Sequence, residues 1–158
     1  MCREHAEFVS NSPDETTKLA KRTARVLSIG DVLLLSGPVG AGKTHFARAV
    51  IQEMLEKSED VPSPTYTLVQ TYATQKCEIW HADLYRISDT GEIIELGLTD
   101  AFSNAICLVE WPEVLGDYAP ENALTLAIEP LTSENERHFS LSWIEPGWTN
   151  RVSKILHE

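Results

Sequence analysis

The chain has 158 residues, of which 42% are hydrophobic and 23% are charged, a balance that predicts one globular domain over residues 1–158 and excludes a multidomain enzyme, a collagen-like repeat and a coiled coil. Its 13 Lys and Arg stand against 24 Asp and Glu, for a formal net charge of −11. Because such a surface repels phosphodiester backbones, we do not expect this chain alone to bind nucleic acid; the acidic excess either faces solvent or meets a basic protein partner.

The first predicted helix begins at Ser12. Ser12 is a candidate N-cap, followed by proline at the first helical position and by Glu15, the capping-box arrangement. Apolar residues recur at helical spacing as far as Leu27, and Gly30 supplies a left-handed stop. We therefore expect a helix that covers one face of a sheet.

A strand, a turn and a second helix are predicted next. The apolar run Val32–Leu35 is typical of a central strand buried on both faces. A glycine-rich turn follows it, and apolar residues then recur at helical spacing from Lys43 to about Lys57. Pro62 and Pro64 favour extended backbone after this helix.

The rest of the chain is predicted to be mostly strands. The stretches 66–72 and 78–84 indicate an antiparallel pair, and Asp89 with Glu92 opens a short helix. Residues 105–109 form a second candidate for a buried strand. Two late stretches alternate apolar and polar residues, namely 123–128 and 138–144. The pattern predicts an α/β protein with a mixed parallel and antiparallel sheet.

Cysteine usage and hydropathy indicate a cytoplasmic protein. Cys2, Cys77 and Cys107 lie far apart without a C-x-x-C pair, which supports neither a disulfide framework nor a structural zinc site. The apolar runs are far shorter than the roughly 18 residues that a membrane-spanning helix needs, and the polar N-terminus shows no secretory signal. We therefore expect no membrane partner.

The glycine-rich turn matches G-x-x-x-x-G-K-[ST], the Walker A or P-loop pattern. The residues of the match are Gly37, Pro38, Val39, Gly40, Ala41, Gly42, Lys43 and Thr44. Glycines in such a loop let backbone N–H groups converge on phosphate at the positive end of the following helix. Lys43 is expected to reach the β- and γ-phosphates and Thr44 to ligate Mg²⁺. The fold class predicted with this motif is the three-layer P-loop NTPase fold.

Acidic residues at the ends of two predicted strands are the candidate catalytic partners of the loop. Glu110 ends the strand over residues 105–109 and is the Walker B candidate for Mg²⁺, although an exposed strand-end glutamate would look the same. Alternation places His81, Asp83 and Tyr85 on one face, where Asp83 could approach magnesium or orient water. Arg86 could neutralise phosphate charge, or could form a surface ion pair with Asp83.

Further nucleotide contacts are predicted on loops. Thr65 and Thr67 follow the P-loop helix, where loops sense the γ-phosphate in P-loop hydrolases, although turn chemistry also explains this segment. Trp111 could pack beside the nucleotide or in the core. The chain contains no Asn-Lys-x-Asp string of the kind that reads guanine in Ras-like proteins. The expected cofactors are therefore ATP or ADP with Mg²⁺.

These segments together resemble the TsaE (YjeE) family of ATPases in bacterial tRNA threonylcarbamoyladenosine biosynthesis. The resemblance covers nearly the whole chain. It rests on the early P-loop and on the segments 62–66, 81–86 and 109–113, which read PSPTY, HADLYR and VEWPE in that order. The P-loop alone is generic, whereas the later segments make the match specific.

The resemblance implies a small ATPase that works with the partner proteins TsaB and TsaD, and that meets tRNA through their complex. By this resemblance Thr44 and Glu110 contact Mg²⁺, Lys43 contacts phosphate, and Asp83 and Trp111 have essential roles. It also suggests adenine contacts on the segment before the first helix and on the late loop 131–133. The residues suggested for adenine are Asn11, Ser12, Ser133 and Arg151.

The expected activity is ATP hydrolysis that is slow in the isolated chain and faster in a complex. The reason is that no residue is an obvious arginine finger, and P-loop hydrolases without that charge depend on a partner. One alternative is a docking module that nucleotide binding gates and in which hydrolysis is incidental. A small-molecule kinase is a weaker alternative, because few arginines and little length remain for a second substrate site.

Overall fold

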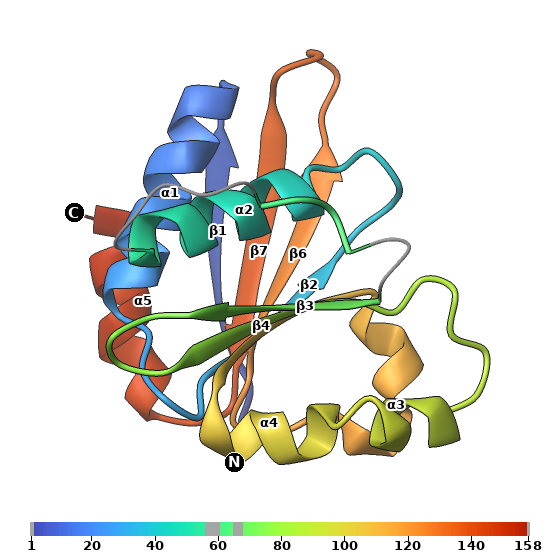
Figure 1. Cartoon of the computed structure of the whole chain (residues 1–158). Coiled ribbons are helices and arrows are strands. Elements are labelled where there is room, and N and C mark those ends of the chain that lie inside the picture. Colours follow the sequence, from blue (N-terminus) through green and yellow to red (C-terminus); the bar gives the residue numbers. More distant parts are fainter. Residues whose placement is uncertain (1, 56–60, 65–67, 158) are drawn as a thin grey trace.

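A mixed sheet of seven strands organises the part of the chain that the computed structural model describes, residues 2–55, 61–64 and 68–157 (Figure 1). The strands are β1 (Glu4–Ser10), β2 (Val32–Ser36), β3 (Val69–Ala73), β4 (Glu78–Asp83), β5 (Ile106–Glu110), β6 (Leu124–Pro130) and β7 (Arg137–Trp143). Their order across the sheet is β1-β7-β6-β2-β5-β4-β3. The strand β2 runs parallel to β5 and β6, and β4 runs parallel to β5. The pairs β1–β7, β6–β7 and β3–β4 are antiparallel, which confirms the predicted mixed sheet.

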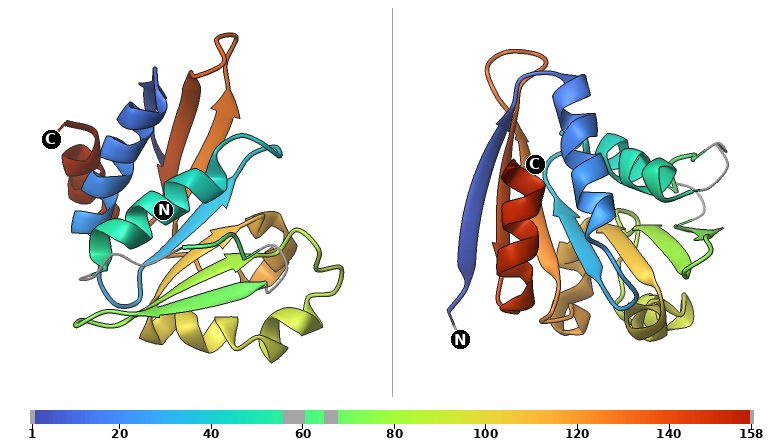
Figure 2. Two further views of the ribbon diagram at one scale, coloured as in Figure 1. Left: turned by 45° about the horizontal axis from the view of Figure 1, so that its top comes forward. Right: turned by 90° about the vertical axis from the view of Figure 1, so that its left-hand side faces the viewer.

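Helices cover both faces of this sheet, as the views in Figure 2 show. On one face lie α1 (Pro13–Arg25), α2 (Lys43–Met54) and α5 (Gly147–His157). On the other lie α3 (Gly91–Glu95), α4 (Leu98–Asn104) and the 3-10 helix η1 (Pro112–Tyr118). The three-layer α/β architecture is therefore confirmed.

The central strand β2 contributes to two separate hydrophobic cores. Leu33 and Leu35 point into the core beneath α1, α2 and α5, while Val32 and Leu34 point into the core beneath α3 and α4. All four side chains are buried. A strand covered on both faces has no polar alternation, which is why its sequence is a continuous apolar run.

The start of α1 confirms the predicted cap, with one difference. The hydroxyl of Ser12 accepts a hydrogen bond from the Glu15 backbone N–H at 3.1 Å. The Glu15 carboxylate reaches back to the backbone N–H of Asn11 rather than to that of Ser12. The helix ends earlier than predicted, at Arg25, and Gly30 lies in the turn before β2, where its φ is +90°. The glycine therefore shapes the entry to β2 and does not stop the helix.

The other predicted elements are present with shifted ends. The helix α2 ends at Met54 because Leu55 is extended, so the predicted extension toward residue 57 is wrong at its described end. Strands β4 to β7 begin or end within about two residues of the predicted bounds. The predicted start of the strand at 66 lies outside the described residues. Sequence reasoning missed β1, α4, η1 and α5.

Candidate functional site

A pocket of about 390 Å³ opens at the carboxyl ends of β2, β4 and β5, beneath the loop that joins β2 to α2. Its lining residues are Val39, Gly40, Gly42, Lys43, Thr44, His45, Asp83, Tyr85, Glu110 and Trp111. The parallel pairing of these strands places Asp83 directly beside Glu110 and Glu110 beside Leu35, the last but one residue of β2. Residues far apart in the sequence thus meet at the edge of the sheet where ligands bind in open α/β folds.

Two glycines give the loop its path. Gly37 has a φ of +141°, and a Cβ atom at this position would lie 2.3 Å from the backbone oxygen of Ile128. Gly42 has a φ of +105° and is the N-cap of α2. Side chains are strained at such φ values, and at Gly37 there is also no room for one.

The first turn of α2 is prepared differently from that of α1. In α1 the Ser12 hydroxyl caps the helix, and the acidic residues Asp14 and Glu15 follow it. In α2 the cap is Gly42, no side chain caps the helix, and the first turn holds no acidic residue. Its backbone N–H groups and the positive end of its dipole therefore face the loop without a carboxylate in that turn.

The Lys43 ammonium folds back onto the loop. Lys43 is 5% exposed, and its Nζ donates hydrogen bonds to the carbonyl oxygens of Gly37 at 2.5 Å and Pro38 at 3.0 Å. The same Nζ lies 4.2 Å from the ring centroid of Trp111. Burial lowers the pKa of Lys43 from its ordinary value of 10.5, although Glu110 and other nearby carboxylates oppose this shift. The ammonium is thus held in a place where burial disfavours its charge.

Glu110 is the centre of a buried polar cluster. It is 2% exposed, and the Thr44 hydroxyl donates to its carboxylate, 2.8 Å from Oε1 and 3.1 Å from Oε2. On the other side the His81 Nε2 atom lies 2.7 Å from Oε2. Because Thr44 donates its hydrogen to Glu110, the lone pairs of its oxygen remain for another contact.

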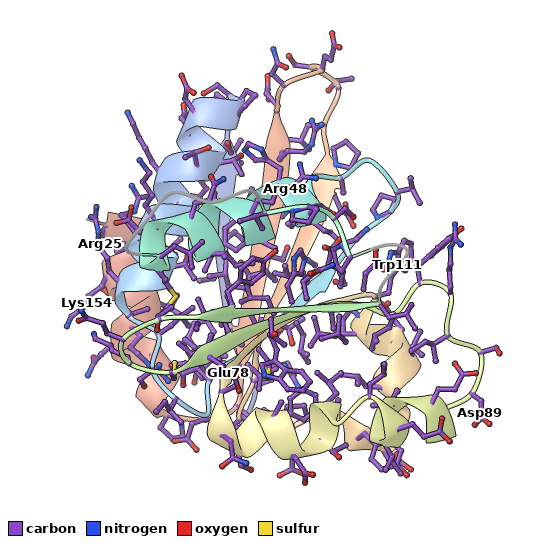
Figure 3. The ribbon with its side chains drawn as sticks, viewed as in Figure 1. Arg25, Arg48, Glu78, Asp89, Trp111 and Lys154 are labelled. Carbon is purple, nitrogen blue, oxygen red and sulfur yellow. The ribbon has the colours of Figure 1, made fainter. Side chains whose placement is uncertain are left out.

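Asp83, Tyr85 and Trp111 form the wall opposite the loop. Asp83 is 7% exposed and accepts a hydrogen bond from the Tyr85 backbone N–H at 3.1 Å. The rings of Tyr85 and Trp111 contact each other, with centroids 4.8 Å apart. Trp111 has a φ of 59° and a ψ of 53°, an unusual conformation for an aromatic residue that turns the chain out of β5. Figure 3 labels Trp111 at this position.

A smaller pocket of about 140 Å³ lies on the other side of the loop, between the starts of α1 and α2. Pro13 and Thr16 line it from α1, and Asn135 and Arg137 line it from the segment that connects β6 to β7 and begins β7. The guanidinium of Arg137 donates to the Ala41 backbone oxygen at 3.0 Å and to the Glu134 backbone oxygen at 2.8 Å. Arg137 therefore ties the P-loop to the β6–β7 connection.

The structure places the predicted adenine contacts in two regions. Asn11 and Ser12 immediately precede Pro13, so they border the smaller pocket, and Ser133 lies on the connection that Arg137 anchors. Arg151 does not lie with them. Its Nη1 atom is 2.5 Å from the Asp31 carboxylate and 3.2 Å from the Val26 backbone oxygen, beside the start of β2. The prediction for Arg151 is corrected, because the P-loop follows the opposite end of that strand.

The remaining predicted contacts have different outcomes. Thr65 and Thr67 lie outside the described residues. Arg86 is exposed on the turn after β4 and is not one of the residues that line the larger pocket. Sequence reasoning assigned no role to His81 or Arg137. His81 could have been found from the alternation that puts it on the same face as Asp83, whereas Arg137 gave no comparable signal.

The fold and the site define a P-loop protein of the α/β class. The family model described as threonylcarbamoyl adenosine biosynthesis protein TsaE matches residues 10–139. The chain belongs to the TsaE family, as its sequence resemblance predicted.

Individual relatives agree with this assignment. The chain is 38% identical over 134 residues to the tRNA threonylcarbamoyladenosine biosynthesis protein TsaE of Rickettsia felis, covering 85% of this chain and 78% of that protein. It is 36% identical over 148 residues to the protein of the same name from Bacillus subtilis, covering 93% and 89%. The crystal structure of Bacillus subtilis YdiB superposes with a TM-score of 0.82 at 25% identity, covering 98% of this chain and 96% of that one.

Two features are absent from the described ranges, namely a membrane-spanning helix and a cluster of metal-ligating side chains. No helix there is both long and apolar enough to cross a membrane. Likewise, among residues 2–55, 61–64 and 68–157, no three His, Cys, Asp or Glu side chains gather as a ready-made metal cluster.

Proposed function

We propose that residues 1–158 form a single P-loop ATPase domain that binds ATP with Mg²⁺ and hydrolyses it in support of tRNA threonylcarbamoyladenosine formation. The observation that carries this proposal is the convergence of Lys43, Thr44 and Glu110 in one pocket at the uncapped start of α2. Family membership supports the pathway. The geometry of the pocket supports the chemistry.

The residues present fit a magnesium nucleotide. The first turn of α2 offers backbone N–H donors and contains no acidic residue, which suits the binding of phosphate oxygens. The Thr44 hydroxyl and the Glu110 carboxylate offer the oxygen ligands that Mg²⁺ prefers. Bound Mg²⁺ supplies charge neutralisation of the phosphate oxygens during phosphoryl transfer.

Lys43 would change partners when phosphate binds. Its ammonium now donates to the carbonyls of Gly37 and Pro38 and lies over the Trp111 ring. Phosphate oxygens are stronger acceptors for an ammonium than neutral carbonyls are. Lys43 is therefore positioned to bind the β- and γ-phosphates and to stabilise charge on them, while Trp111 shields the ammonium from water.

The two walls of the site have different proposed roles. Asp83 faces the larger pocket beside Glu110, where it would orient the attacking water or a magnesium-bound water. The smaller pocket would hold adenine, with Asn11, Ser12 and Ser133 at its border contributing through backbone atoms. Thr65 stays a proposed sensor of the γ-phosphate.

We further propose that hydrolysis is slow in the isolated chain and faster in the presence of TsaB and TsaD. The described residues that line the larger pocket include no arginine, so no guanidinium is in place to stabilise charge on the transferred phosphoryl group. An arginine finger supplied by a partner raises the rate of P-loop hydrolases by about 10³ to 10⁵. The chain would act in the cytoplasm and meet tRNA through this complex rather than directly.

Phosphate release from Mg-ATP tests the proposal. The rate is measured for the chain alone and mixed with TsaB and TsaD, with Lys43→Ala as the blank. We expect release that the partners stimulate and that the Lys43→Ala protein does not show. Equal rates with and without partners would contradict partner activation.

The Glu110→Gln variant separates hydrolysis from docking. Its amide keeps the size of the side chain but loses the charge, so nucleotide should still bind, with a smaller gain in affinity from Mg²⁺, while hydrolysis is lost. If complementation of a strain that lacks the gene needs hydrolysis, Glu110→Gln should fail. An unimpaired Glu110→Gln strain would favour the docking module, in which nucleotide binding alone gates partner contact.

A further inference from the structure

His81 is a buried polar residue in the candidate site to which the proposed chemistry gives no task. It lies in the middle of β4, paired with Leu108 of β5, and its side chain is 0% exposed. Its Nε2 atom is 2.7 Å from Oε2 of Glu110. A polar side chain that is removed from water costs free energy unless its hydrogen bonds are made, so this contact is the main compensation for burying the ring.

The hydrogen-bond partners assign the tautomer of His81. An ionised carboxylate only accepts hydrogen bonds, so Nε2 carries the hydrogen that lies between the ring and Glu110. The second ring nitrogen, Nδ1, is buried and has no hydrogen-bond partner among the residues that the structure describes. The ring therefore directs its one satisfied polar contact at Glu110.

Three groups compete for the Glu110 carboxylate. Thr44 donates to it, 2.8 Å from Oε1, and the Lys43 ammonium attracts it electrostatically. If Glu110 turned toward Lys43, the carboxylate would leave Thr44 and neutralise the ammonium that should meet phosphate. His81 holds Oε2 from the side of the sheet, away from the loop.

We propose that His81 is a positioning residue that fixes the Glu110 carboxylate beside Thr44, so that both oxygen ligands are in place before magnesium nucleotide arrives. This inference rests on the proposed function and adds a residue to it. A buried donor that orients a carboxylate ligand commonly changes metal affinity or activity by about 10- to 100-fold when it is removed.

Two amide substitutions test the proposal in the full chain. In His81→Gln the amide nitrogen reaches the place of the imidazole Nε2, so the hydrogen bond to Oε2 is kept. In His81→Asn the amide reaches only the place of Nδ1, so the bond is lost while a polar amide remains. Cys107→Ala is the control, because Cys107 is a buried residue on the adjoining strand that points to the opposite face.

Binding of a non-hydrolysable ATP analogue is measured in about 5 mM Mg²⁺ and in EDTA. The readout, called the magnesium factor, is the ratio of the two affinities. We expect this factor to fall about tenfold or more in His81→Asn and to stay near the wild-type value in His81→Gln and Cys107→Ala. Affinity in EDTA should stay unchanged in His81→Gln and Cys107→Ala. In His81→Asn it should fall by less than the magnesium factor does, because the freed carboxylate partly neutralises the Lys43 ammonium. In His81→Asn, the KM for Mg-ATP in partner-stimulated hydrolysis should rise in line with the weaker binding, and kcat should fall as well, because the same carboxylate would hold the magnesium during hydrolysis.

The outcomes separate the inference from the proposed function. A wild-type chain whose analogue affinity ignores Mg²⁺ would overturn both. A magnesium-dependent wild type with an unchanged His81→Asn factor, or with His81→Gln as impaired as His81→Asn, would overturn the positioning role alone.

A measurement on the wild-type chain covers the case in which His81→Asn does not fold. In ¹⁵N-histidine NMR spectra, His81 should show the tautomer with hydrogen on Nε2, protected from exchange, both before and after the magnesium analogue is added. A hydrogen on Nδ1, or rapid exchange at Nε2, would overturn the proposal.

Discussion

Both ends of the central strand β2 hold charged groups that are mostly removed from water, but the two ends treat these charges differently. At the amino end, Arg151 pairs with Asp31 at 2.5 Å, donates to the Val26 backbone oxygen and stacks on the Trp148 ring at 3.6 Å. Asp31 also accepts from the Ser28 backbone N–H at 2.7 Å. Each charge there has an opposite charge as its partner, so the cluster is complete.

At the carboxyl end, Lys43 meets two neutral carbonyls and an aromatic ring instead of a carboxylate partner of its own. Burial accordingly lowers its pKa. The Glu110 carboxylate is engaged by a hydroxyl and an imidazole, which are weaker partners than a cation. In the structural ion pair, each charge has an opposite charge of the protein as its partner. In the binding site, neutral groups hold the charges in place, and a ligand can replace those groups.

The largest effect that this comparison predicts is the loss of function in Lys43→Met. The substitution keeps the apolar stem and removes the ammonium, so partner-stimulated phosphate release should fall by about 10²- to 10³-fold. The free energy of unfolding should change little or rise, because the folded chain no longer has to bury a charge at this position. Phosphate release and thermal unfolding of the ligand-free chain check both parts. A destabilisation of about 2 kcal/mol, the value expected below for Arg151→Met, would show that Lys43 has a structural role.

Arg151→Met is the matched substitution at the other end. It should lower the free energy of unfolding by about 2 kcal/mol, since it leaves the Asp31 carboxylate without its cation and removes the stack on Trp148. For a chain of this length the melting temperature should fall by about 4–8 °C. ATP affinity should stay at the wild-type value. If Arg151→Met lost nucleotide binding while its stability stayed unchanged, Arg151 would be an adenine contact as the sequence resemblance suggests.

The same comparison explains what the sequence could and could not predict. The P-loop, the strand β2 and the acidic end of β5 are local patterns, in which a few neighbouring residues determine both backbone and burial. The pairing of Asp31 with Arg151 joins residues 120 positions apart, and no local pattern reports it. A structural arginine and one that binds a ligand look alike in a single sequence, and the resemblance that suggests Arg151 as an adenine contact does not report its pairing with Asp31.

The missed elements follow from the same limit. The strand β1 is an edge strand with an exposed polar face, so its apolar alternation is weak. Its partner β7 lies far along the chain, so no local pattern reports the pairing. The helix α5 carried a usable signal, because Trp148, Val152 and Ile155 recur at helical spacing and are all buried. The contact of His81 with Glu110 depends on the parallel pairing of β4 with β5, which only the fold establishes.

The middle of the sheet supplies a third case, the buried thiol of Cys107, which has no oppositely charged partner among the described residues. Burial raises the pKa of the Cys107 thiol from its ordinary value of 9.0 to about 12. Above pH 9 the unfolded chain releases this proton while the folded chain keeps it, so stability should fall by about 1 kcal/mol for each pH unit between 9 and 12. Cys107→Ala should remove this part of the slope. Urea unfolding of both proteins at pH 8, 9 and 10 measures it, and parallel slopes would contradict the raised pKa.

The smallest effect concerns Ser12, a residue at the binding end whose side chain is already satisfied. Its hydroxyl caps α1 through the Glu15 backbone N–H at 3.1 Å. Ser12→Ala should therefore cost about 1 kcal/mol of unfolding free energy, and Ser12→Asp, which keeps a capping oxygen, should cost less. Neither should weaken ATP binding, since only backbone atoms of this segment are proposed to meet adenine. Chemical unfolding and nucleotide titration of the same samples separate the two roles. The contrary result is weaker ATP binding in Ser12→Ala, with stability but not affinity restored in Ser12→Asp. The hydroxyl would then contact the nucleotide directly. A side chain at this end of β2 could not be assigned to a structural role merely because its hydrogen bonds are made within the protein.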